Sequence, residues 1–189
     1  GVPGGALTVV DADALRVTDL PGSPNVLVAN LPYNVSVPVL LHFMETFAGI
    51  ERGVVMVQAE VGERLAAPPG SKVYGSPSVK AAWYGPWRLA GTVSRQVFWP
   101  VPNVDSVLVG FSRDAEPRGD EALRRATFQI VDAAFGQRRK MLRQAVAPVL
   151  GGSAASASAV LEAAGVDPTA RGEQLTIDDF VRIARAAAV

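Results

Sequence analysis

The stretch Val26-Leu27-Val28-Ala29-Asn30-Leu31-Pro32-Tyr33 decides which fold we expect for the chain. Its first four residues are apolar and follow the turn residues Gly22 to Asn25, which predicts a buried strand. An amide, a proline and an aromatic ring come where that strand ends, and in open α/β sheets ligands bind beyond the carboxyl ends of strands. The amide donates and accepts hydrogen bonds and the ring offers a stacking face, which would suit a nucleobase. A plain structural turn would use the same residue types, so the tetrapeptide alone leaves both interpretations open.

Composition limits the class of protein. The chain has 189 residues, of which 49% are hydrophobic and 19% charged, as in one large globular domain or a domain with a smaller companion. The sequence shows no apolar run of about 18 residues and no basic segment leading into an apolar one, so we expect neither a membrane span nor a signal peptide. Cysteine is absent, which excludes disulfides and thiolate metal sites and suits a cytoplasmic protein. A net charge of zero argues mildly against nucleic-acid binding, although clustering matters more than the sum.

Strand and helix patterns alternate in the first part of the chain. We expect strands at residues 6–10, 26–29, 53–57, 88–97 and 106–111, and helices at residues 36–47, 58–67 and 78–84. The last two strands have no helix between them, so the predicted fold class is α/β with an antiparallel edge. After the polar linker 113–121 the pattern is wholly helical, with helices at 121–135, from 138 to about 150, up to 164, and after the capping residue Thr176. We therefore predict two domains, residues 1–113 and 114–189.

The loop between the last two strands begins with Phe98-Trp99 and contains Pro100 and Pro102. Two prolines stiffen a connection, and a stiff loop can hold an aromatic ring in one orientation. We expect Trp99 to pack on the hydrophobic core. For Phe98 the loop alone leaves open whether the ring packs on the core or serves as a stacking platform.

The densest positive charge lies between Gln137 and Arg143. Its four cations cannot all share one helical face, but they surround the start of a predicted helix. A solvated charged face and a patch that contacts phosphates both remain open, since arginine is a good phosphate ligand. The four residues are Arg138, Arg139, Lys140 and Arg143.

Four stretches together resemble the family of small-subunit (16S) ribosomal RNA adenine dimethyltransferases, the KsgA/RsmA group, along nearly the whole chain. They are Asn30 to Ser36, the loop Phe98-x-Pro100-x-Pro102-x-Val104-Asp105-Ser106, Phe135 to Lys140, and Arg171 to Thr176. The stretch Val73-Tyr74-Gly75-x-x-Ser78-Val79 adds to the resemblance. The resemblance implies a Rossmann-like methyltransferase sheet followed by a small helical domain, with S-adenosylmethionine as cofactor.

The resemblance also implies a reaction and a set of site residues. The reaction is dimethylation of the exocyclic N6 amine of two adjacent adenosines near the 3′ end of small-subunit rRNA, as part of small-subunit biogenesis. The implied partner is this rRNA in an immature 30S-type subunit, and we expect a monomer with no metal and no membrane partner. The implied roles are catalytic for Asn30, Leu31, Pro32 and Tyr33, base stacking for Tyr33 and Phe98, cofactor binding for Asp13, Ala14 and Asn30, and RNA binding for Arg138, Arg139, Lys140 and Arg143.

The chain departs from the family pattern in one large respect. The glycine-rich cofactor loop, the acidic residue that holds the cofactor ribose and the first two strands of the sheet have no counterpart in these residues and would lie upstream. The resemblance therefore implies impaired cofactor binding, and we expect this chain alone to be inactive. Two alternatives remain: a large-subunit rRNA adenine methyltransferase of the macrolide-resistance type, and a non-catalytic ribosome-assembly or transcription factor on the same scaffold.

Overall fold

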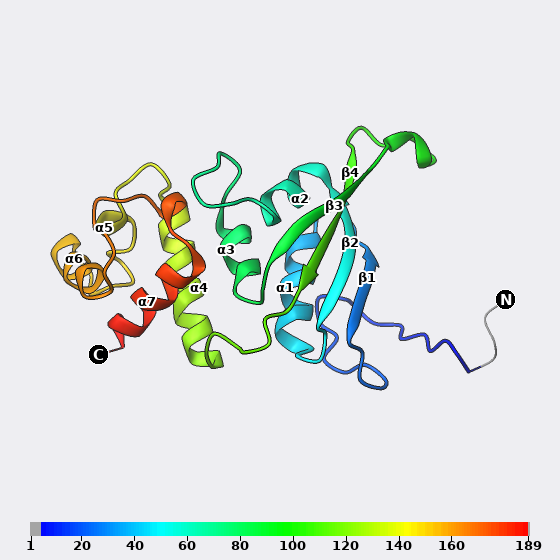
Figure 1. The fold of residues 1–189 in the computed structure, drawn as a ribbon, viewed down its shortest axis with the longest axis horizontal. Helices are drawn as coiled ribbons and strands as arrows, with labels where there is room; N and C mark the ends of the chain where they lie inside the picture. Colours follow the sequence, from blue (N-terminus) through cyan, green and yellow to red (C-terminus); the bar gives the residue numbers. More distant parts are fainter. Residues whose placement is uncertain (1–4, 189) are drawn as a thin grey trace. The chain divides into compact units, whose positions relative to one another are not determined.

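The computed structural model of the protein describes residues 5–188 (Figure 1). Its chain divides into two compact units, which we describe separately: one runs to Gly62 and includes Arg88–Arg113, and the other contains Glu63–Trp87 and the chain from Asp114 onward. The sequence analysis placed residues 63–87 in the first domain, whereas the structure groups them with the helices of the second unit. Residues 1–4 of the first predicted domain and Val189 of the second lie outside the described residues.

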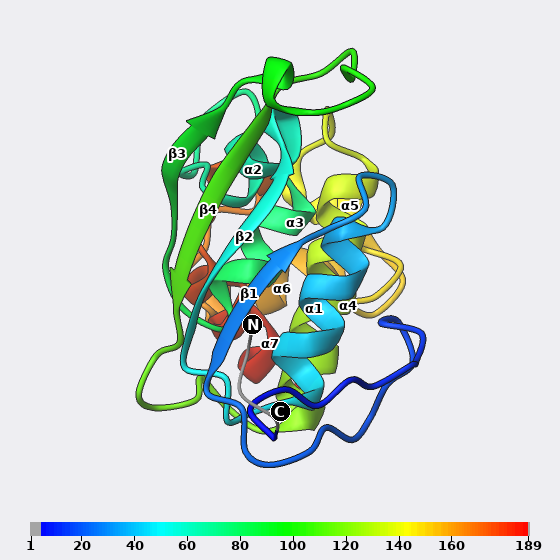
Figure 2. The ribbon, with the colours of Figure 1, turned by 90° about the vertical axis from the view of Figure 1, so that its right-hand side faces the viewer.

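A four-stranded sheet in the order β1-β2-β4-β3 forms the first unit (Figure 2). Its strands are β1 (Val26–Asn30), β2 (Arg52–Gln58), β3 (Trp87–Val93) and β4 (Ser106–Ser112). β1 runs parallel to β2, and helix α1 (Ser36–Thr46) makes the crossover that a parallel pair requires. β2 runs antiparallel to β4, and helix α2 (Ala59–Leu65) follows β2 directly. The predicted α/β class is confirmed.

One face of the sheet is buried. Along β2 the side chains alternate, so that Val55 and Val57 are buried while Arg52 and Val54 are exposed. Buried residues of β4 and of α1 complete this core. Each aliphatic side chain buried here contributes about 1.5–3 kcal/mol to folding. The core thus fixes the positions of β2 and β4.

Three strand predictions need correction. Residues 6–10 form no strand and are exposed, because no described strand pairs with them and apolar composition alone does not provide hydrogen-bond partners. β1 exists but is not buried: its side chains are alternately exposed and half-buried, and the side chain of Val28 is 79% exposed. The predicted strand 88–97 ends at Val93, and residues 95–97 form a short 3-10 helix, η1 (Arg95–Val97), capped by the hydroxyl of Ser94.

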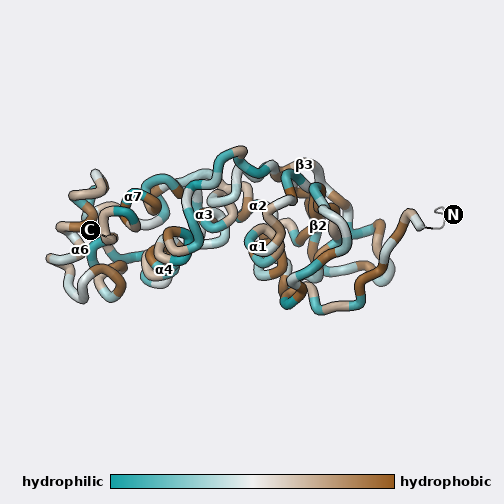
Figure 3. The backbone as a smooth tube through the Cα atoms, turned by 90° about the horizontal axis from the view of Figure 1, so that it is seen from below, coloured by the Kyte–Doolittle hydropathy of each residue, from teal (hydrophilic) through white to brown (hydrophobic). Residues whose placement is uncertain are grey.

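The second unit is helical. It contains α3 (Ser76–Ala82), α4 (Glu121–Gly136), α5 (Leu142–Ala145), α6 (Ala154–Ala163), the 3-10 helix η2 (Gly172–Gln174) and α7 (Ile177–Ala187). Hydrophobic and hydrophilic residues alternate along α7 (Figure 3). The cap predicted at Thr176 is confirmed, and reciprocal hydrogen bonds between Thr176 and Asp179 form a capping box. No described helix combines the length and apolarity needed to cross a membrane.

The helix predicted from residue 138 to about 150 is the largest error in this unit. Only Leu142–Ala145 is helical. The backbone N–H groups of Leu142 and Arg143 donate to the carbonyls of Ala170 (2.7 Å) and Pro168 (3.0 Å), so tertiary contacts take the donors of this helix start. Residues 137–140 instead close a turn through Lys140 N and Gln137 O (2.8 Å).

Candidate functional site

Three strand ends meet at one edge of the sheet. Asn30, the last residue of β1, pairs with Met56, and Gln58, the last residue of β2, pairs with Ser106, the first residue of β4. The backbone N–H of Leu31 donates to Met56 O (3.2 Å) and extends the pairing past the end of β1. The predicted catalytic stretch and the end of the Phe98–Ser106 loop therefore lie at the same edge.

A hydrogen bond joins these two stretches directly. The hydroxyl of Tyr33 lies 2.8 Å from the Oγ of the buried Ser106. Two further bonds hold the turn that carries Tyr33: Val35 N donates to Pro32 O (3.4 Å), and Ser36 Oγ donates to Tyr33 O (3.4 Å). The sequence indicated both stretches but not this contact, which depends on the pairing of β1 with β2 and of β2 with β4.

The four residues of the strand-end stretch differ in exposure. Leu31 is buried and anchors the stretch in the core, whereas Asn30 and Pro32 are exposed and Tyr33 is half-buried. An exposed amide beside a half-buried phenol ring offers a hydrogen-bonding group and a stacking face together. This combination suits a flat, polar ring that enters from solvent.

The Phe98–Ser106 loop extends beyond the ends of β3 and β4 (Figures 1 and 2). Its return arm is attached to α2, because Ala59 N donates to Asp105 O (2.9 Å), and its two arms are linked by an Arg95–Asp105 ion pair (3.6 Å). Phe98 is half-buried. Trp99 does not pack on the core as expected: its side chain is 94% exposed, because the loop extends past the region where a core exists.

A polar pocket of about 300 Å³ opens at this edge, between the loop and the start of α2. Amides, carboxylates and a guanidinium line it, which are groups that recognise the polar edges of nucleotides. Sequence reasoning did not identify it, because its walls come from β2, α2 and the loop. The lining residues are Gln58, Ala59, Glu60, Arg95, Asn103, Val104 and Asp105.

The predicted cofactor residues Asp13 and Ala14 lie in an exposed turn. The Asp13 carboxylate accepts from Leu15 N (2.9 Å) and pairs with Arg16 (3.7 Å), so its contacts stay within its own turn. The cofactor-binding role of these two residues stays a prediction. Nor do His, Asp or Glu side chains gather into a potential metal site anywhere in residues 5–188.

The four predicted RNA-binding cations differ in their contacts. Arg138 is engaged, because its guanidinium donates to Glu173 (2.8 Å) and to Lys72 O (2.9 Å). Arg139 and Lys140 are exposed on the turn before α5, and Arg143 is half-buried within α5. The structure thus separates one cation with a structural role from a pair that is available to an anionic partner.

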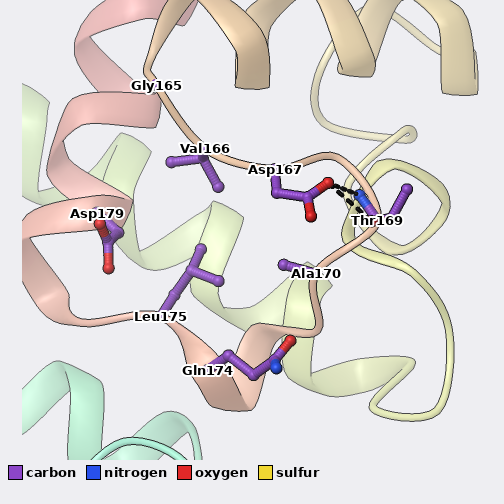
Figure 4. A pocket seen from close by; sticks show the side chains of 8 residues that line it. All are labelled: Gly165, Val166, Asp167, Thr169, Ala170, Gln174, Leu175 and Asp179. Atoms are coloured by element: carbon purple, nitrogen blue, oxygen red, sulfur yellow. Dashed lines mark hydrogen bonds between the residues drawn. The ribbon is translucent and has the colours of Figure 1, made fainter.

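The helical unit also contains a pocket of about 470 Å³ that the sequence analysis did not identify (Figure 4). Val166 and Leu175 provide an apolar wall, while Asp167 and Asp179 add carboxylates. Hydrogen bonds from the backbone N–H and the hydroxyl of Thr169 lower the pKa of Asp167. This surface is acidic, in contrast to the turn that carries Arg139 and Lys140.

Tyr74 connects two of the stretches quoted from the sequence. Its hydroxyl donates to the carbonyl of Leu175 (2.8 Å), which ties the segment around Val73–Gly75 to the segment Arg171–Thr176. Burial raises the pKa of Tyr74 to about 12, and the negative charge of Asp179 adds to this effect. The neutral phenol is therefore the form that the fold favours.

Replacing Tyr74 by phenylalanine is expected to destabilise the helical unit. The change leaves the carbonyl of the buried Leu175 without this donor, at a cost of about 1–3 kcal/mol, and each kcal/mol lowers Tm by about 2–4 °C. Thermal unfolding at pH 7 measures the loss. Because the folded pKa lies above the ordinary value of 10.0, the contribution is full below pH 10 and disappears as pH rises through about 12. Equal Tm values of parent and variant at pH 7 would contradict this role.

Comparison with known proteins gives consistent matches. A family model described as ribosomal RNA adenine dimethylase matches residues 3–188. Ribosomal RNA small subunit methyltransferase A of Leifsonia xyli subsp. xyli is 71% identical over 180 residues, which are 95% of this chain and 64% of that relative. The protein of the same name from Streptomyces coelicolor is 60% identical over 177 residues, which are 93% of this chain and 62% of the relative. The chain thus spans less than two thirds of the length of either relative.

Two solved structures resemble the fold. A dimethyladenosine transferase from Plasmodium falciparum superposes with a TM-score of 0.78 at 21% identity, covering 92% of this chain and 70% of that one. The 23S rRNA methyltransferase ErmE superposes with a TM-score of 0.67 at 22% identity, covering 95% of this chain and 71% of that one. At these identities the likeness shows the fold, which is the Rossmann-like arrangement that the sequence predicted.

Proposed function

The chain belongs to the ribosomal RNA adenine dimethylase family, and from this premise we propose that it carries the substrate side of an S-adenosylmethionine-dependent RNA methyltransferase. The reaction is dimethylation of the exocyclic N6 amine of two adjacent adenosines near the 3′ end of small-subunit rRNA. The observation that carries the proposal is the hydrogen bond between Tyr33 and Ser106, since it joins the strand-end stretch to the loop that carries Phe98. The names of the two relatives support the small subunit as the target.

Asn30 and Leu31 would activate the amine. An adenine amine is a poor nucleophile, because its lone pair is delocalised into the ring. Hydrogen bonds from its two N–H groups to the Asn30 side-chain oxygen and the Leu31 carbonyl favour a tetrahedral nitrogen and localise the lone pair. Pro32 restricts the backbone and so gives the Leu31 carbonyl a fixed direction. Positioning and electrostatics then account for most of the rate.

Tyr33 and Phe98 would hold the target base after it leaves the RNA stack. Stacking between two rings compensates the base for its lost neighbours. The cofactor, when bound, supplies the methyl group. As the localised lone pair of the amine forms a bond to that methyl, the methyl–sulfur bond would break and its electron pair would leave with a neutral thioether. The amine would then release a proton to water, so the chain does not need to provide a strong base for this step.

The helical unit would hold the RNA through phosphates. The cations that serve this role are Arg139, Lys140 and Arg143, while the ion pair of Arg138 with Glu173 shapes the turn that carries Arg139 and Lys140. We assign residues 114–189 to this RNA-binding domain and residues 1–113 to the methyltransferase domain. The partner is rRNA in an immature small subunit, which a monomer would meet in the cytoplasm.

The RNA-binding assignment predicts different effects for neighbouring cations. Joint replacement of Arg139 and Lys140 by alanine should weaken RNA binding and reduce the slope of log K against log salt by about 1.5, since each phosphate contact contributes about 0.7–0.9. The Tm of this double variant should stay unchanged, because both side chains are exposed. Arg138→Ala should instead lower Tm, because it breaks the bonds to Glu173 and Lys72 O.

Filter-binding titrations at several salt concentrations measure the slope. Arg125→Ala is the matched control, because Arg125 is an exposed cation of the same unit whose ion pair is with Glu121 on its own helix. The assignment fails if the control and the double variant change the slope equally.

A methylation assay tests the function itself. Two proteins are compared: the 189-residue chain, and the chain joined to the part of the Leifsonia relative that the match leaves uncovered. Each receives methyl-labelled S-adenosylmethionine with unmethylated small or large ribosomal subunits. We expect the joined protein to label the small subunit, and the chain alone to label neither, because its sequence contains no glycine-rich loop after a strand.

Each other outcome favours a named alternative. Label in the large subunit would favour the macrolide-resistance type of enzyme. RNA binding without label from the joined protein would favour a non-catalytic assembly factor. Label transferred by the chain alone would show that its own residues suffice for cofactor binding.

A further inference from the structure

Trp99 is the most exposed large hydrophobic side chain in the described part of the chain, at 94%. Its neighbours in the loop, Val97 and Val101, are 69% and 52% exposed. Exposed aromatic surface of this kind marks contact sites, and an exposed ring on a rigid support is what base stacking requires. The mechanism above uses Phe98 but leaves Trp99 without a role.

The loop holds the backbone that carries this ring in place. Ser94 caps η1, whose last residue directly precedes Phe98, and the Arg95–Asp105 ion pair closes the base of the loop. Asp105 O in turn accepts from Ala59 N, so the loop is fixed to α2. Pro100 and Pro102 restrict the backbone on the far side of Trp99. A backbone that is already fixed loses little conformational freedom when a partner binds.

The backbone directs Phe98 and Trp99 to different sides. Phe98 has extended dihedral angles, φ −105° and ψ 148°, and successive side chains of an extended chain point in opposite directions. Phe98 is half-buried while Trp99 is exposed, as this alternation requires. The two rings therefore cannot stack on the same base.

We propose that Trp99 is a second stacking platform, which binds an unpaired RNA base that flanks the adenosine held by Tyr33 and Phe98. The proposal rests on the proposed function, because it takes the partner to be RNA. Trp99 lies next to that site in the chain, because Phe98 and Trp99 are consecutive residues of one loop. Indole stacking accepts any base, so this platform would contribute affinity and register rather than sequence choice.

Binding of RNA without cofactor tests the proposal independently of methyl transfer. The probe is a hairpin RNA with a single-stranded adenosine-containing loop, made also with abasic residues at one loop position at a time. Trp99→Leu should weaken binding about fivefold or more, whereas Trp99→Phe, which keeps a ring, should stay within about twofold of the parent. Val97→Ala is the matched control, as an exposed apolar residue of the same loop.

The abasic series identifies the base. At one position that flanks the target, an abasic residue should weaken binding to the parent about fivefold and have no further effect on the Trp99→Leu variant. Additive losses at every position, or an equal affinity of parent and variant, would overturn the proposal, as would a parent that does not bind the hairpin. A shift in oligomeric state on Trp99→Leu would show that the ring contacts a second copy and would also overturn it. Failure of methyl transfer with the coupling intact would instead refute the proposed function alone.

Discussion

Replacing Asn30 by alanine should reduce methyl transfer by about a hundredfold or more and leave RNA affinity within about twofold. Asn30 is exposed at the end of β1, so its loss removes no packing. Its side-chain oxygen is the acceptor that localises the lone pair of the adenine amine, and removal of one preorganised polar group from a reaction centre costs about 10²–10³ in rate. Single-turnover methylation by the joined protein, with saturating RNA, measures the loss.

Asn34→Ala is the control for Asn30→Ala. Asn34 is also an exposed asparagine and lies in the turn that follows Tyr33, but the mechanism gives its side chain no role. Near-normal turnover of the Asn30 variant would refute the catalytic role of that residue. Equal losses in both variants would point to a disturbed turn between Pro32 and Ser36 rather than to a lost acceptor.

Local signals predicted much of the fold. The apolar run before Asn30, the apolar run at residues 53–57 and the cap of α7 at Thr176 are set by nearby residues, and all three elements are present. Residues 6–10 have the same apolar character as β1 but form no strand, because a strand depends on a partner that its own sequence does not specify. The helix predicted from Arg138 fails for a related reason, since Ala170 and Pro168 take the N–H groups at its start.

The candidate site was predicted in its parts but not in its assembly. The residue types of Asn30 and Tyr33 indicated base recognition, and the loop prolines indicated a rigid support. The bond between Tyr33 and Ser106 depends on the register of β2 with β4, and no sequence pattern encodes that register. The exposure of Trp99 was mispredicted because a hydrophobic residue usually packs inward, and sequence alone did not show that its loop extends beyond the sheet.

Among glycine-to-alanine substitutions in the sheet, Gly53→Ala should be the most destabilising. A Cβ at this position would overlap the backbone carbonyl of Leu27 in β1 and lie 2.5 Å from the ring of Phe111. Overpacking of a core costs about 1–3 kcal/mol, and we expect at least the upper end here because the Leu27 atom belongs to the backbone of the neighbouring strand. β1 would have to move away from β2, and Asn30 would move with it. The variant should therefore lose stability and methyl transfer together.

Gly110→Ala provides the matched control for this prediction. Gly110 is a buried glycine of β4 in the same sheet, but a Cβ there would meet nothing nearer than Ala90 Cβ at 3.8 Å, which is an ordinary contact. Alanine also loses less backbone entropy than glycine on folding, by about 0.5–1 kcal/mol, so this variant should match or exceed the parent in Tm. If both variants matched the parent in Tm and in methyl transfer, the position of Asn30 would not depend on close packing of β1 against β2. Loss of methyl transfer from Gly53→Ala with an unchanged Tm would instead show that β1 shifts without unfolding, which still places Asn30 under the control of that packing.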